Sequence, residues 1–151
     1  MMKTLLENLQ KRLAEVEELK YIDEDWGQLD YYSPNMPVQW PCCLIDIQRA
    51  DYSNMGKDFS KRPRDRQNVS LSVELTLANI KLTNTSFQAP KGQKNNAWEI
   101  FGWAEKIHQK LHGFSPLENA SKMLRVSFAR VQRDDGVQEY KIVYNLEMHN
   151  V

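Results

Sequence analysis

The run from 69 to 77 constrains the fold most strongly, because apolar and polar residues alternate along it without interruption: Val69, Leu71, Val73, Leu75 and Leu77 alternate with Ser70, Ser72, Glu74 and Thr76. Successive side chains of a strand point to opposite faces, so the alternation predicts a strand with one buried face and one wet face. After Leu77 the apolar residues change parity, and we predict a β-bulge near Ala78–Asn79 that absorbs the shift. A strand continuous from 69 to 82 spans about 46 Å, so we expect part of it to project from the body.

Two segments carry the 3.6-residue period of amphipathic helices. The first is 4–20, in which Thr4 and Glu7 have the spacing of a capping box. The second is 96–112, in which Asn96 is the predicted cap and Gly113 follows the C-terminus. Their apolar stripes are Leu5, Leu6, Leu9, Leu13 and Val16 in the first, and Ala97, Ile100, Phe101, Ala104, Ile107 and Leu111 in the second.

A strand around 39–48 has apolar residues on both faces, which predicts cover on two sides. Cys42 and Cys43 are neighbours in it and point to opposite faces, a poor geometry for a disulfide. We interpret them as reduced packing residues, since the alternative of a reactive thiol lacks nearby basic residues. The preceding stretch 21–37 is interpreted as a loop, with a short strand as the alternative.

The last third of the chain is predicted to be a β-hairpin with a three-residue loop, 134–136. This register places three apolar pairs on one face, and Gly136 takes the left-handed position of the turn. The pairs are Phe128 with Ile142, Val126 with Tyr144, and Leu124 with Leu146. The chain is therefore expected to be one α+β domain, 1–151. Its sheet is antiparallel, with four strands or five, both helices pack on one face, and the order is α-β-β-α-β-β.

Composition excludes several classes of protein. The 151 residues carry 20 basic and 20 acidic side chains, and the zero net charge argues against wholesale nucleic-acid binding. No apolar run approaches the length of a membrane span. Charged and apolar residues alternate over 1–7, unlike a signal peptide, so we expect the protein to stay inside the cell.

Motifs that carry a mechanism by themselves are absent from the sequence, so we predict no enzyme, no catalytic residue and no cofactor. His108 and His112 lie four residues apart on one helix face, as two metal ligands would. Residue 109 is Gln, however, where a zinc hydrolase of this pattern needs Glu as its base. We therefore predict no metal site, and we interpret His108 as a hydrogen-bonded histidine at the edge of the core.

The segment 49–68 lacks periodicity and is far longer than an ordinary hairpin loop. Within 57–66, five basic residues stand against two acidic ones, a net charge of +3; the basic ones are Lys57, Lys61, Arg62, Arg64 and Arg66. One interpretation is a solvated loop, and a second is an arm that orders on residues 1–25 of a neighbouring copy, where the net charge is −3. Nucleic-acid binding is the third. Trp103 has two interpretations: its ring lies over neighbouring side chains, or it contacts the surface of a partner protein.

In architecture the chain resembles the tail-terminator and tail-completion proteins of long-tailed bacteriophages and prophages. The resemblance rests on the leucine-rich first helix, the strand pair with its long polar connection, the tryptophan-bearing helix and the closing hairpin 124–148. It implies a non-enzymatic subunit of a ring, usually sixfold, that caps the tail tube and joins tail to head. The implied partners are other copies, the tail-tube protein and a head-completion protein, first in the host cytoplasm and then in the virion. The alternatives are a small nucleic-acid-associated or regulatory module that uses 57–66, and a metal hydrolase that uses His108 and His112.

Overall fold

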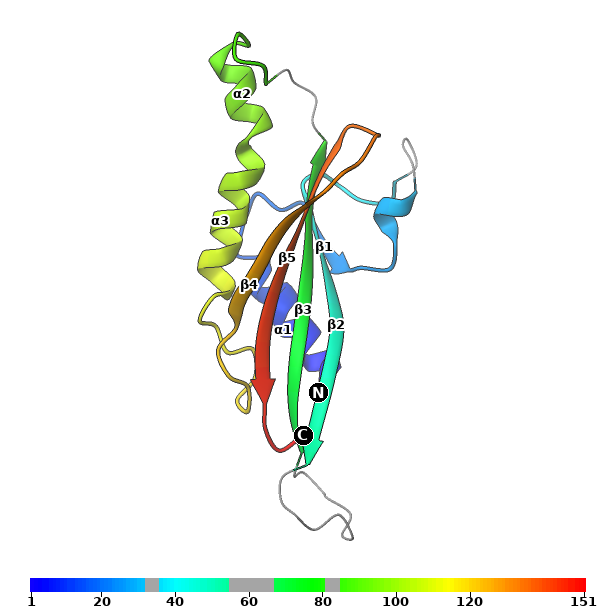
Figure 1. Ribbon diagram of the computed structural model, residues 1–151, viewed down its shortest axis with the longest axis vertical. Coiled ribbons are helices and arrows are strands. Elements are labelled where there is room, and N and C mark those ends of the chain that lie inside the picture. The colour runs from blue at the N-terminus through cyan, green and yellow to red at the C-terminus, as the bar shows by residue number, and fades with distance from the viewer. Residues whose placement is uncertain (32–35, 55–66, 81–84) are drawn as a thin grey trace.

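The computed structural model describes residues 1–31, 36–54, 67–80 and 85–151. It is an α+β fold with a five-stranded sheet, and the strands lie side by side in the order β1-β2-β3-β5-β4 (Figure 1). The strands are β1 (Tyr21–Glu24), β2 (Cys42–Asn54), β3 (Gln67–Ile80), β4 (Leu124–Val131) and β5 (Val137–Met148). The helices are α1 (Met2–Leu13), α2 (Lys91–Ala97) and α3 (Glu99–Leu111), with a single 3-10 turn at Gln28–Asp30.

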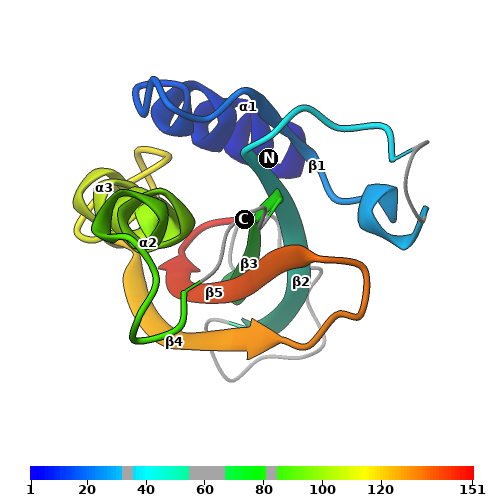
Figure 2. The same ribbon diagram turned by 90° about the horizontal axis from the view of Figure 1, so that it is seen from above.

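The sheet curves around α1 and α3, which cover the same face (Figure 2). The apolar stripes predicted for the two helices meet the inward side chains of β3 and β5 in one large core. Leu5, Leu9 and Leu13 of α1 and Ile107 and Leu111 of α3 are fully buried there. The two amphipathic patterns therefore predicted most of the covered helix residues correctly, but Phe101, which was predicted in the second stripe, is 41% exposed.

A smaller apolar cluster lies on the face of the sheet opposite α1 and α3, where side chains from 21–31 and 36–40 pack against one end of β2 and β3. Leu29 packs there against Cys42, Leu44 and Ala78. Cys43 belongs to the main core, so residues 42–45 of β2 are buried on both faces, and the two free thiols are packing residues, as predicted. The two-sided cover predicted for 39–48 stops there, because the described part of β2 from residue 46 on is half-buried or exposed. Burial raises the pKa of the Cys42 thiol to about 12 and raises that of Cys43 as well.

The same cluster explains why the apolar residues change parity after Leu77. The β-bulge predicted near residues 78–79 to absorb that change was wrong. Thr76 and Ala78 are buried because the second face is covered at that end of β3. The strand itself pairs in unbroken register with β5 from Val69 to Ile80. No described part of β3 projects from the body, because β2 and β5 flank it along its length.

Strand boundaries differ from the sequence prediction in three places. A short strand, β1, forms within 21–37 and pairs parallel with β2, so the sheet is mixed rather than antiparallel. Strand β2 runs on to Asn54 and β3 starts at Gln67, so the predicted loop 49–68 was wrong at both ends. What remains of that loop, 55–66, lies outside the described residues.

The helices also depart from the predicted bounds. Helix α1 starts at Met2 with no side-chain cap, so the Thr4–Glu7 capping box was wrong, and it ends at Leu13 rather than near 20. The second helix is two helices that meet at Trp98, and Asn96 lies inside α2 instead of capping. Gly113 does follow the C-terminus, with a φ of 79° that favours glycine.

The predicted hairpin register is correct near its loop and wrong near its base. Phe128 lies opposite Ile142, and Gly136 has a φ of 76°, both as expected. A register shift between Arg125 and Ser127 places Arg125 opposite Tyr144, so the pairs predicted for Val126 and Leu124 do not form. A second shift lies in β2 between Ile47 and Arg49. Both irregularities fall at the outer part of the sheet, where bulges are common.

Candidate functional site

Strand β4 forms one edge of the sheet and leaves apolar side chains uncovered. It pairs with β5 on one side and with no described strand on the other. Every residue from Leu124 to Arg130 is exposed, and the exposed fractions of Leu124, Val126 and Phe128 are 54%, 54% and 41%. A strand of this kind is a template for pairing or docking with another chain.

A groove runs between β4 and α3, and it continues this uncovered surface. It has a volume of about 400 Å³ and is lined by Phe101 and Ala104 of α3 and by Val126 and Phe128 of β4. Glu105 and Arg125 also line it and carry opposite charges. Its aromatic wall extends through Tyr140, whose ring lies 5.4 Å from that of Phe101 and 4.9 Å from that of Phe128. Three contacting rings give the groove a fixed apolar shape.

A second hollow of about 250 Å³ shares Phe101 with the groove and lies toward the loop of the hairpin. Trp98 lines it, at the junction of α2 and α3, and 47% of its side chain is exposed. Arg130 of β4 lines its other side. We define the β4 surface as Trp98, Phe101, Leu124, Arg125, Val126, Phe128 and Arg130.

The charges on β4 are all positive. Residues 120–133 contain four basic residues and no acidic one. Lys122, Arg125 and Arg130 make no ion pair with another described residue. Arg133 differs, since its guanidinium is buried against Asp135 and Glu139. The exposed strand therefore presents guanidinium groups that no described residue pairs with, among apolar side chains, the combination found at protein interfaces.

The two histidines behind this surface make hydrogen bonds within the fold. His108 Nδ1 lies 3.2 Å from the hydroxyl of Tyr144, and His112 Nδ1 accepts the backbone N–H of Arg125 at 3.2 Å. Burial lowers the pKa of His108, and electrostatic interactions with Arg125 and His112 lower it further. Among the residues that the structure describes, no group of three or more His, Cys, Asp or Glu side chains is arranged to hold a metal ion.

On the face of the sheet opposite α1 and α3, a network of charged side chains lies next to β1. Lys141 Nζ lies 3.3 Å from Glu74, 3.7 Å from Glu139 and 3.9 Å from Asp25, and it donates to Thr76 Oγ1 at 2.7 Å. These contacts fix the end of β1 to β3 and β5. Burial, with the charges of Asp25 and Glu74, raises the pKa of nearby Asp46.

The predicted contact residues are only partly placed by the structure. Lys57, Lys61, Arg62, Arg64 and Arg66 lie outside the described residues. Trp103 is half-buried and packs against the main core, which is the first of its two interpretations. The exposed aromatic residues nearby are Trp98, which precedes α3, and Phe101 in α3. Sequence reasoning missed these and the apolar residues of β4, because periodicity does not tell an apolar face that is covered from one that is open.

The comparisons with known proteins gave no match, neither to a protein-family model nor to a curated protein. Over the described ranges, no helix has the length and apolar character needed to cross a membrane.

Proposed function

We propose that the chain is a structural subunit of a phage tail terminator or neck, which assembles with copies of itself into a ring. The observation that carries the proposal is the β4 surface, an open sheet edge with half-exposed apolar side chains. Monomeric proteins blunt such edges with charges, bulges or covering loops. Strand β4 has two of these features, a register shift at Val126 and two arginines, yet three of its large apolar residues stay uncovered.

A ring subunit needs such a surface because its fold is completed by its neighbours. Cyclic assemblies use head-to-tail contacts in which two different patches of the same chain meet. The ring, expected to be sixfold by resemblance, caps the tail tube and stops its growth. Its outer faces contact the tail-tube protein on one side and a head-completion protein on the other. This places the protein in the host cytoplasm during assembly and in the virion afterwards.

The test is the absolute mass of the purified full chain, measured by light scattering on a sizing column from low to high micromolar concentration. We expect a closed oligomer near six subunits, with rings visible by electron microscopy in the same fractions. A single-chain mass at every concentration, together with normal tail lengths in a phage that lacks the gene, would refute the proposal.

A second candidate is a nucleic-acid-associated module, favoured by the net charge of +3 over 57–66. Binding driven by phosphate contacts weakens steeply with salt. A monomer that binds duplex DNA with a steep salt dependence would support this candidate over the ring.

A further inference from the structure

We propose that the β4 surface of one copy docks on the opposite edge of the sheet in the next copy, on a surface formed by residues 21–31. This inference rests on the proposed ring function and names the two patches that would build the ring. We call the second patch the β1 surface and define it as Glu24, Trp26, Asp30 and Tyr31.

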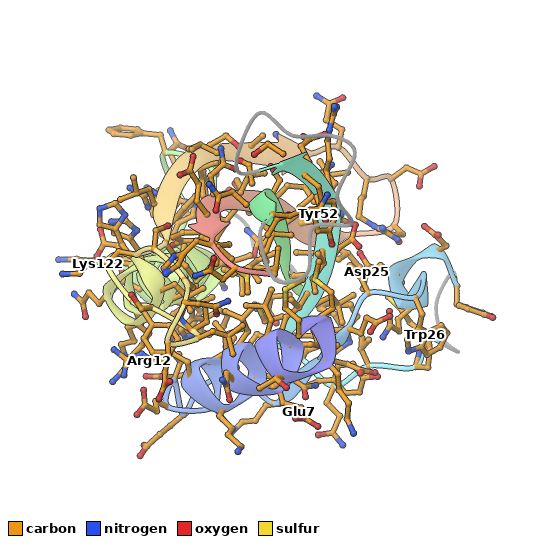
Figure 3. The ribbon with its side chains drawn as sticks, turned by 90° about the horizontal axis from the view of Figure 1, so that it is seen from below. Glu7, Arg12, Asp25, Trp26, Tyr52 and Lys122 are labelled. Carbon is orange, nitrogen blue, oxygen red and sulfur yellow. The ribbon has the colours of Figure 1, made fainter. Side chains whose placement is uncertain are left out.

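The two surfaces lie at opposite edges of the sheet. Strands β2, β3 and β5 separate β1 from β4. In Figure 3, Lys122, which immediately precedes β4, lies on one side of the molecule, and Asp25 and Trp26 lie on the other. A contact between them joins two different patches of one chain, so it repeats from copy to copy and closes into a ring when the rotation permits.

The charges of the two edges are complementary. Residues 21–31 contain four acidic residues and no basic one, whereas 120–133 contain four basic residues and no acidic one. Glu24 and Asp30 are exposed and form no ion pair with another described residue, as is true of Arg125 and Arg130 at the other edge. Complementary patches of this kind steer association and fix its orientation.

The β1 surface also offers aromatic rings in a fixed position. Trp26 and Tyr31 are each 54% exposed, and their rings meet edge to face at 6.1 Å. The indole N–H of Trp26 donates to Asp23 at 3.3 Å, and Asp23 is held in turn by Tyr21 and Gln28. An anchored, half-exposed tryptophan is the residue type that dominates interface energetics, and it stacks well on arginine.

Pairing of β4 with β4 of a second copy is disfavoured by the same charges. It would bring Arg125 and Arg130 of both copies to one interface with no described acidic residue of either β4 to balance them. It would also produce a closed dimer rather than a ring. The shift at Val126 interrupts the outer strand, so we expect side chains to form most of the contact, with little continuous backbone pairing.

The test reverses the charges of each edge in the full chain and measures mass by light scattering. One variant carries Arg125→Glu and Arg130→Glu, and the other carries Glu24→Lys and Asp30→Lys. Each alone should weaken self-association at least about 100-fold, because like charges then face each other. Mixed in equal amounts, the two should assemble again, since the acidic β4 of one matches the basic β1 surface of the other.

The matched control reverses two exposed charges that lie outside both surfaces and outside residues 1–25, Lys91→Glu and Glu118→Lys, and should leave the mass unchanged. Circular dichroism confirms that each variant is folded. A wild-type oligomer that both edge variants preserve would overturn this inference while leaving the ring function standing. Loss of assembly in both edge variants without rescue on mixing would also overturn it. A wild-type chain that is monomeric at every concentration would overturn this inference, and the tail-length test would then decide whether the proposed ring function falls with it.

Discussion

Replacing Arg133 by methionine should destabilise the fold more than any other single loss of a charge in the described chain. The side chain of Arg133 is 12% exposed, and its partners Asp135 and Glu139 are 8% and 6% exposed. The guanidinium lies 2.6 Å from Asp135 and 2.9 Å from Glu139, and it also donates to the backbone oxygen of Leu29. It therefore ties the hairpin loop to the segment that covers the second face of the sheet.

The expected magnitude follows from the charges left behind. Removing one partner of a buried ion pair costs about 3–5 kcal/mol, because the other charge stays buried without compensation. Lys141 lies 3.7 Å from Glu139 and compensates part of the loss, which favours the lower end, about 3 kcal/mol. For a chain of 151 residues this corresponds to a fall in Tm of about 6–12 °C.

The control is Arg49→Met, which breaks an ion pair of the same type on the surface. Arg49 lies 2.8 Å from Asp51, with exposed side-chain fractions of 73% and 61%. Exposed pairs contribute about 0.2–1 kcal/mol, so Tm should fall by less than about 4 °C. Thermal unfolding followed by circular dichroism at pH 7 measures both variants. Equal losses at the two positions would refute the reasoning.

The Arg133→Met variant should also differ from the wild type in how its stability depends on pH. Hydrogen bonds from Arg133 hold the pKa of Asp135 below its usual value against the opposing effect of burial. In the wild type this stabilisation is complete at neutral pH and is lost as the pH falls through the lowered pKa. Without Arg133, burial dominates, and protonation of Asp135 relieves the unpaired charge. The gap in Tm between wild type and variant should therefore narrow from pH 7 to pH 3, and a constant gap would contradict an electrostatic origin.

Three further predictions concern other parts of the molecule. Gly136 has a φ of 76°, so Gly136→Ala should lower the free energy of unfolding by about 1 kcal/mol. Gly102 lies in α3 with open space around its Cα, so Gly102→Ala should raise the free energy of unfolding by about 0.5–1 kcal/mol. Urea titrations measure both, and a change of the same sign at the two positions would be inconsistent with the turn geometry. Because burial lowers the pKa of His108, stability should decline from pH 7.5 to 5.5, and His108→Gln should flatten that slope in thermal scans. If an arm at 57–66 contributes to assembly, reversing its arginine charges should weaken self-association at low salt, and an unchanged mass at low and high salt would exclude that arm.

The sequence predicted the parts of the fold that depend on neighbouring residues. Alternation over 69–77 defined the central strand, and two helical stripes identified the residues that meet it in the core. Turn chemistry at Gly136 set the register that places Phe128 opposite Ile142. Periodicity and turn geometry are local properties, so one chain segment contains all the information they need.

The predictions that failed required knowledge of distant partners. The parity change at Ala78 indicated a bulge, but it reflects cover from Leu29 on the second face. The actual register shifts, at Gln48 and Val126, leave no mark in the local pattern. Strand β1 is short and parallel, and only pairing with β2 defines it.

The candidate site divides in the same way. The sequence by itself determined that Leu124, Val126 and Phe128 are apolar and that the two chain segments 21–31 and 120–133 carry opposite charge. Only the tertiary structure decided that these segments form the two opposite edges of one sheet and that the apolar residues of β4 stay open. The physical reason is that strand order and solvent exposure depend on long-range packing, which residue identity and local spacing do not encode.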